Sequence, residues 1–192
     1  MSIKFPLAAS SWEKEELDAM QRVIATGMFT MGENVKAFEK DFAQFVGSKH
    51  CVMVNSGSSA NLLIVAALFY TKNADLKLQR GDEIIVPAVS WSTTYYPLYQ
   101  YGLKIKFVDI DLHTLNYDLE QLALAVTDKT RAIMAVNLLG NPNDFERIQE
   151  IIGDRKIVLI EDNCESMGAT YNGKQAGTFG VMGSFSSFFS HH

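Results

Sequence analysis

Cysteine is scarce in this chain of 192 residues, and the two that occur, Cys51 and Cys164, lie far apart without CxxC spacing. This pattern predicts neither a disulfide framework nor a metal site. Free cysteines are typical of a reducing compartment, so we expect a cytoplasmic location.

Long apolar runs are also missing. No stretch approaches the roughly 18 apolar residues that a membrane span needs. The first six residues lack a charged leader followed by an apolar run. The sequence therefore argues against both secretion and membrane insertion.

Positive charge is in deficit, with 17 Lys and Arg against 22 Asp and Glu and a net charge of −5. Non-specific binding to nucleic acid needs the opposite sign, because the phosphates must be neutralised. We expect no nucleic-acid partner and favour a small ligand that the protein recognises locally.

The overall composition is that of a folded protein. Hydrophobic residues make up 47% and charged residues 20% of the chain, which excludes a disordered or collagen-like protein. The length predicts one domain or a little more. No repeat, low-complexity segment or linker-like stretch indicates an internal boundary.

Two helices are predicted in the first 47 residues. Ser10 and Glu13 have the spacing of a capping box, and apolar residues then recur at helical intervals to about Gly27. The second helix ends near Gly47, which suits a C-terminal cap. Its apolar face consists of Val35, Phe38, Phe42 and Phe45.

The rest of the sequence alternates between strands and helices. The predicted strands are short apolar runs at residues 51–54, 83–86, 105–108, 132–136 and 157–160, with a sixth strand and its exit turn at 184–190. The predicted helices between them occupy residues 60–70, 93–101, 119–126 and 145–152. Such alternation predicts an α/β fold with a mostly parallel sheet and helices on both faces.

Ligands of parallel sheets bind outside the carboxyl ends of the strands. Residues 56–59 (Ser-Gly-Ser-Ser) join a predicted strand to a helix, so backbone N–H groups and the positive helix end would face one point. This predicts a phosphate cradle at Gly57 and Ser58, although a serine N-cap with a glycine turn explains the same residues. The segment matches neither a P-loop nor GxGxxG, which argues against a Rossmann reductase.

Three further loop residues suit a bound heterocycle. Asp162 follows the strand at 157–160, where a carboxylate could pair with a protonated ring nitrogen or simply cap a turn. Trp91 could lie flat on an aromatic ligand or pack in the protein. His191 follows the sixth strand and could move protons, whereas a surface or tag histidine is the simpler interpretation.

In this chain order the residues resemble the sugar aminotransferase family of pyridoxal-phosphate enzymes, which have the aspartate aminotransferase type of fold. The resemblance covers essentially the whole chain. The segments that carry it are residues 29–32, 56–60, 86–88, 108–111, 137–140, 161–169 and 183–186.

The resemblance implies a role for each candidate residue. Gly57, Ser58 and Ser186 would bind the cofactor phosphate, and Trp91 would stack on the pyridine ring. Asp162 would pair with the ring nitrogen and keep it protonated as an electron sink. The family usually has Gln or His near the cofactor hydroxyl, and here Glu165 occupies that place. No metal site is implied.

One position departs from the family pattern. The lysine that tethers the cofactor normally follows five residues after the position of Ser186, and here that residue is His191. An imidazole has no primary amine, so it cannot tether the cofactor, yet it can remove and return a proton. His192 lies one residue beyond the lysine position.

With this substitution the chain resembles the nucleotide-sugar 3-dehydratase branch of the family. In that branch a transamination half-reaction is combined with elimination of a hydroxyl from the sugar. That branch implies pyridoxal and pyridoxamine phosphate as cofactors, glutamate as amino donor and a GDP-linked 4-keto-6-deoxy sugar as substrate. It also implies a homodimer whose active sites are completed by the second subunit.

Three alternatives remain open at this point. The chain could belong to a dehydrase of the same branch that uses an iron–sulfur cluster and acts on a CDP-linked sugar. It could be an ordinary sugar aminotransferase, against which His191 argues. It could also be an inactive chain that only pairs with another subunit.

The members of the family are much longer than this chain. We therefore expect residues 1–192 to hold the N-terminal segment and most of the PLP-binding large domain, an α/β domain of the PLP-transferase type. The last strand of the large sheet and the small C-terminal domain would be absent.

Overall fold

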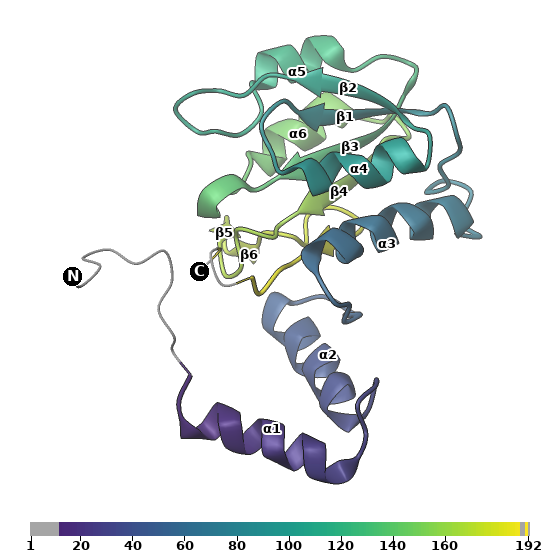
Figure 1. The fold of residues 1–192 in the computed structure, drawn as a ribbon. Coiled ribbons are helices and arrows are strands. Elements are labelled where there is room, and N and C mark those ends of the chain that lie inside the picture. Colours follow the sequence, from purple (N-terminus) through teal and green to yellow (C-terminus); the bar gives the residue numbers. More distant parts are fainter. Residues whose placement is uncertain (1–11, 189–190, 192) are drawn as a thin grey trace, which may run out of the picture. The chain divides into compact units, whose positions relative to one another are not determined.

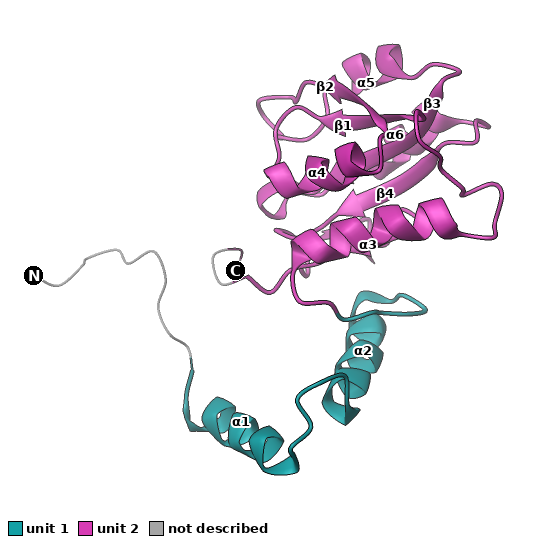
Figure 2. Cartoon of the chain, turned by 45° about the vertical axis from the view of Figure 1, so that its right-hand side comes forward, with its two compact units in different colours: residues 1–53, 192 teal, residues 54–191 magenta. Residues whose placement is uncertain are grey.

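The computed structural model describes residues 12–188 and residue 191. The chain divides into two compact units, and the division falls between Met53 and Val54 (Figure 2). The sequence predicts no boundary there because the residues around it are apolar rather than linker-like.

The first unit contains helices α1 (Lys14–Thr26) and α2 (Glu33–Val46). The backbone N–H of Glu13 donates to the Glu16 carboxylate at 2.8 Å, which starts α1. The predicted cap residue Ser10 lies outside the described residues. Both helices end as predicted, because Gly27 and Gly47 take the left-handed backbone conformation (φ 67° and 73°) that terminates a helix at little steric cost.

The second unit is built on a parallel sheet with strand order β2-β1-β3-β4-β7, of which Figure 1 labels the first four strands. The strands are β1 (Glu83–Pro87), β2 (Lys104–Val108), β3 (Thr130–Val136), β4 (Val158–Asp162) and β7 (Gly183–Ser184). The helices between them are α3 (Gly57–Tyr70), α4 (Ser92–Gln100), α5 (Leu119–Ala125) and α6 (Phe145–Ile152). The short pieces are the 3-10 turn η1 (Leu138–Gly140) and the hairpin β5 (Thr170–Tyr171) to β6 (Lys174–Gln175). This arrangement confirms the predicted α/β fold.

Two apolar layers sandwich the sheet. Side chains of α3 and α4 pack against one face, which includes Ile84, Val86 and Ile160. Side chains of α5 and α6 pack against the other face, which includes Ile85 and Leu159. Because neighbouring residues of a strand point to opposite faces, the middle of each central strand is a continuous apolar run.

The prediction of a strand at residues 51–54 is wrong. These residues form no strand in the described chain, and Val52 and Met53 are exposed. An apolar run becomes a strand only where a neighbouring strand supplies hydrogen bonds, and periodicity cannot show whether one is present. Within the described residues, no helix is both long and apolar enough to cross a membrane.

The two leucines of α5 test the packing of this layer. Leu122 is fully buried, whereas Leu124 on the same helix is 78% exposed. We expect Leu122→Ala to lower the free energy of unfolding by about 2–5 kcal/mol, because it leaves a cavity. Leu124→Ala should change it by less than about 0.5 kcal/mol. Denaturant unfolding of both variants checks this, and equal effects would contradict the packing described.

Candidate active site

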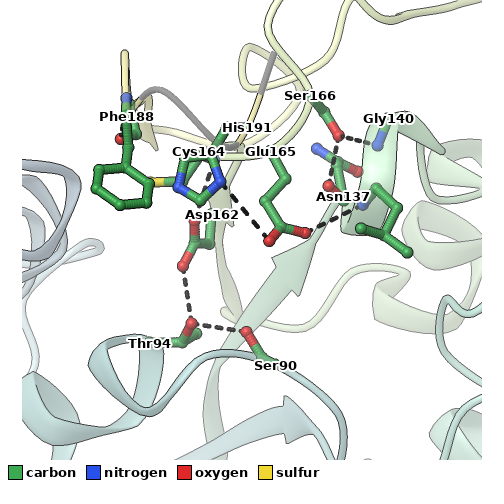
Figure 3. Close-up of polar contacts among 12 residues, drawn as sticks. Ser90, Thr94, Asn137, Gly140, Asp162, Cys164, Glu165, Ser166, Phe188 and His191 are labelled. Carbon is green, nitrogen blue, oxygen red and sulfur yellow. Dashed lines mark hydrogen bonds and ion pairs between the residues drawn. The ribbon is translucent and has the colours of Figure 1, made fainter. Parts of the chain in front are cut away.

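Three of the predicted site residues, Asp162, Glu165 and His191, lie near one another at the carboxyl edge of the sheet (Figure 3). Asp162 ends β4 and pairs with Ser184, which ends β7. Asn137 follows β3, and its backbone N–H donates to the carbonyl of Asp162 at 3.0 Å. Three parallel strands therefore deliver polar residues to one place.

Asp162 is nearly buried, and chain donors hold both of its oxygens. Oδ2 accepts hydrogen bonds from Asn61 Nδ2 and Thr94 Oγ1, each at 2.8 Å. Oδ1 accepts from the backbone N–H of Cys164 at 3.2 Å and, at 3.4 Å, from the hydroxyl of Ser184. This carboxylate is fixed in position by donors from α3, α4, β7 and its own loop.

The sequence did not reveal Thr94 and Asn61 as donors to Asp162. Thr94 has a single hydroxyl hydrogen, which it donates to Asp162, so Ser90 must be the donor in the 2.7 Å contact between the Ser90 and Thr94 hydroxyls. Asn61 is buried on a helix whose following residues are almost all apolar. A lone buried amide of this kind is the signal that could have revealed it, since buried polar groups need partners.

Glu161, next to Asp162, has a structural role. Its fully buried carboxylate accepts hydrogen bonds from the backbone N–H groups of Gly177, Phe179 and Gly180 at 2.6–2.7 Å. Burial raises the pKa of Glu161, and these bonds together with one from Asn137 oppose that rise. The carboxylate thereby fastens the loop that leads into β7.

Gly57 opens α3 in a crowded place. A Cβ atom on this residue would lie 2.6 Å from Cys164 Sγ and 3.1 Å from Ser186 Cβ. Gly57 and Ser186 therefore lie side by side although they are far apart in the sequence. The Ser56 hydroxyl accepts from the backbone N–H of Ser59 at 3.1 Å, so the N-cap interpretation is confirmed as well.

Ser58 and Trp91 are exposed at the first turns of two helices. Ser58 follows Gly57 in α3, and Trp91 directly precedes α4. The Trp91 side chain is 74% exposed, so it is not a core residue. A flat aromatic face next to a helix start is available to a ligand.

His191 lies at the same edge, near Glu165 and Phe188 (Figure 3). Its Nδ1 atom is 3.8 Å from Glu165 Oε1, and both side chains are partly buried. The phenyl ring of Phe188 meets the imidazole edge to face, with 5.2 Å between ring centroids. His192 lies outside the described residues.

The donor set fits a flat, phosphorylated heterocycle. The absence of a side chain on Gly57 lets the start of α3, whose N–H groups suit a phosphate, approach Ser186 and Cys164 closely. Asp162 offers a fixed carboxylate to a ring nitrogen. Burial and the charge of Asp162 raise the pKa of the neighbouring Cys164 thiol well above its usual value, so the thiol stays neutral. Among the described residues, no group of three His, Cys, Asp or Glu side chains could hold a metal ion.

The chain is similar to proteins of known name. GDP-4-keto-6-deoxy-D-mannose 3-dehydratase of Yersinia pseudotuberculosis is 66% identical over 190 residues, which are 99% of this chain and 48% of the relative. The structure of the E. coli enzyme of that name with bound hydrated PLP is 64% identical and covers 100% of this chain and 49% of that one, with a TM-score of 0.95.

A third comparison agrees with these two. A GDP-4-keto-6-deoxymannose-3-dehydratase structure with a trapped PLP-glutamate geminal diamine is 64% identical, with a TM-score of 0.93, over 97% of this chain and 48% of that one. The chain thus spans about half the length of the relatives it matches. The fold expected from the family resemblance is confirmed, and residues 10–192 match the sequence pattern of one family. The chain belongs to the DegT/DnrJ/EryC1/StrS aminotransferase family.

Proposed function

We propose that the protein acts as a nucleotide-sugar 3-dehydratase that depends on pyridoxal and pyridoxamine phosphate. The observation that carries this proposal is His191. It lies near Asp162 at the edge of the sheet, and by the family resemblance it takes the position of the cofactor-tethering lysine. The names of the relatives at 64–66% identity support the same reading and favour it over an ordinary sugar aminotransferase.

The substrate that this proposal assigns is GDP-4-keto-6-deoxy-D-mannose, with glutamate as amino donor. Carbon 3 of the sugar would lose its hydroxyl and gain hydrogen. The two electrons for this reduction come from glutamate, which leaves as its keto acid and ammonia. The product would feed deoxysugar synthesis, and we assign the protein to colitose formation for lipopolysaccharide O-antigen.

The cofactor would be held by non-covalent contacts alone. Gly57, Ser58 and Ser186 would bind its phosphate, and Trp91 would cover its ring. Asp162 would pair with the ring nitrogen, since a carboxylate fixed by four donors favours a protonated partner. When bound, the pyridoxamine form supplies an amine for the sugar ketone and a ring that accepts electrons.

His191 would be the proton-transferring group of the elimination. Its imidazole would take a proton from the aminomethyl carbon of the cofactor, and the hydroxyl on carbon 3 of the sugar would then leave. Without a lysine amine that could recapture the cofactor, the route to an amino sugar is closed. Hydrolysis then releases the deoxy sugar.

The remaining assignments extend the same proposal. We place the protein in the cytoplasm as a homodimer whose active sites are completed by the second subunit. Residues 1–192 would form the N-terminal segment and most of the large cofactor-binding domain, with the small C-terminal domain outside them.

The proposal is tested by incubating the protein with pyridoxal phosphate, glutamate and GDP-4-keto-6-deoxy-D-mannose. We expect a 3-deoxy sugar, ammonia and the keto acid of glutamate in equal amounts. Borohydride should leave the cofactor unattached to the chain. An amino sugar as product, or cofactor reduced onto the wild-type protein, would refute the dehydratase assignment.

His191→Lys should change the way in which the cofactor is held. The new amine should attach the cofactor covalently after borohydride treatment, visible as a mass increase of the protein. Dehydration should fall by about 10²-fold or more, because the proton-transferring imidazole is gone. His191→Gln is the matched control, which should lose dehydration without gaining the attachment. Undiminished dehydration in both variants would remove His191 from the reaction.

Asp162→Asn should weaken cofactor binding. A hydrogen bond to a charged group contributes about 1.5–3 kcal/mol, which corresponds to about a 10- to 100-fold rise in Kd. Titration of the protein with pyridoxal phosphate, followed by absorbance, measures this. Asp128→Asn removes an exposed carboxylate between α5 and β3 and should leave the Kd unchanged. An unchanged Kd in Asp162→Asn would contradict the pairing.

Gly57→Ala tests the crowded start of α3. The added methyl group meets Cys164 Sγ at 2.6 Å, so we expect it to displace the helix start and weaken binding of pyridoxal phosphate by about tenfold or more. The double variant with Cys164→Ala removes that sulfur atom and should recover part of the affinity. Full affinity in the single variant would show that Gly57 does not shape the phosphate site.

A further inference from the structure

Glu165 is anchored by a loop that comes from a different strand. Its Oε2 atom accepts a hydrogen bond from the backbone N–H of Leu139 at 3.2 Å. Leu139 lies in the turn η1 after β3, in the left-handed backbone region (φ 52°). In the same turn, the N–H of Gly140 donates to the Ser166 hydroxyl at 3.0 Å. These bonds, together with the one that the Ser166 hydroxyl donates to the carbonyl of Asn137, join the loops after β3 and β4, and the bond from Leu139 holds one oxygen of the Glu165 carboxylate.

The other oxygen of Glu165 faces the imidazole of His191. The distance from Oε1 to Nδ1 is 3.8 Å, with the two side chains 30% and 22% exposed. This distance is longer than a direct hydrogen bond. A small side-chain rotation would bring the two atoms within hydrogen-bond distance, and one water molecule would also connect them. Catalytic hydrogen bonds are often this long before a ligand is bound.

His191 presents Nδ1 to Glu165 because its own segment orients the ring. The backbone N–H of His191 donates to the carbonyl of Phe188 at 3.0 Å, and the Phe188 ring lies against the imidazole. The other titratable side chains drawn around the imidazole in Figure 3 are Asp162 and Cys164. Because the pKa of the Cys164 thiol is raised, Glu165 and Asp162 are the charged side chains among those labelled there.

A carboxylate next to Nδ1 selects one of the two neutral forms of imidazole. The proton stays on Nδ1, where it points at the carboxylate, and the lone pair is then on Nε2. In a catalytic Ser-His-Asp triad the acid likewise orients the imidazole without taking its proton.

We infer that Glu165 is a positioning residue for His191. Resting on the proposed function, this inference assigns Nε2 of His191 as the atom that accepts and returns the proton. It adds to the role expected from the family pattern, in which residue 165 lies near the cofactor hydroxyl. Glu165 also links the turn at Leu139 to the base.

The experiment measures the tautomer of His191 by nitrogen NMR of the ¹⁵N-histidine-labelled protein, without cofactor. The chain has four histidines, and the His191 signal is assigned by its loss in His191→Gln. In the wild-type protein the Nδ1-protonated form should dominate. Glu165→Ala should shift the tautomer ratio toward Nε2–H by about two- to fivefold, the range of a partly exposed ion pair.

Two further variants separate positioning from general damage. Glu165→Gln retains an oxygen that can accept from Nδ1–H, so it should recover part of the wild-type ratio and of kcat. Asp154→Asn, an exposed carboxylate in the loop after α6, should change neither. Both Glu165 variants should lower kcat for dehydration much more than they change KM for the sugar.

The outcomes distinguish this inference from the proposed function. A wild-type protein with mainly Nε2–H imidazole, or an unchanged ratio in Glu165→Ala, would overturn the inference even if dehydration is observed. The expected tautomers in a protein that forms no deoxy sugar would overturn the proposed function and leave the pairing of Glu165 with His191 standing. The wild-type measurement needs no variant, so a variant that fails to fold does not remove the test.

Discussion

Strand β4 pairs in parallel with β3 and β7, and its two neighbouring carboxylates point to opposite faces of the sheet. The rest of the site depends on that placement. Glu161 lies on the face of Leu159, where it fastens the loop before β7. Asp162 lies on the face of Ile160, where α3 and α4 supply its donors. The period of two residues in a strand thus separates a structural acid from a ligand-binding acid.

The helices on the Asp162 face cover the sheet and also supply residues of the candidate site. Both α3 and α4 begin at the carboxyl edge. Gly57 and Trp91 lie at their starts, and Asn61 in the second turn of α3 and Thr94 in the first turn of α4 donate to Asp162. The apolar side of each helix fixes this alignment, because Ile64 and Leu98 are packed in one core with Ile84. The geometry of the site therefore rests on the packing of the apolar layer behind it.

Much of this was predictable from the sequence, because it depends on local patterns. Short apolar runs and helical spacing locate the strands β1 to β4 and the helices α3 to α6 to within a few residues, and their alternation predicts that the strands are parallel. Gly57 and Asp162 are singled out by their places after predicted strands, whereas Ser186 and the role of His191 come from the family resemblance. The run at residues 51–54 has the same local pattern and is not a strand, since a strand also needs a partner.

What could not be predicted depends on contacts between distant residues. Asn61 and Asp162 are 101 positions apart, and nothing in either segment alone indicates that they meet. The turn at Leu139 and the side chain of Glu165 are joined in the same manner. The two neighbouring acids Glu161 and Asp162 look equivalent in the sequence, and only the three-dimensional register shows that one is enclosed by backbone donors.

The surroundings of Cys164 affect how readily its thiol reacts with oxidants and alkylating agents. Thiols react with oxidants and alkylating agents as thiolates. Burial and the charge of Asp162 keep this thiol protonated, and it lies against Gly57 and the Ser184 hydroxyl. The sulfur atom in the candidate site therefore acts as a small packing group against Gly57, and its raised pKa leaves little of it in the reactive thiolate form.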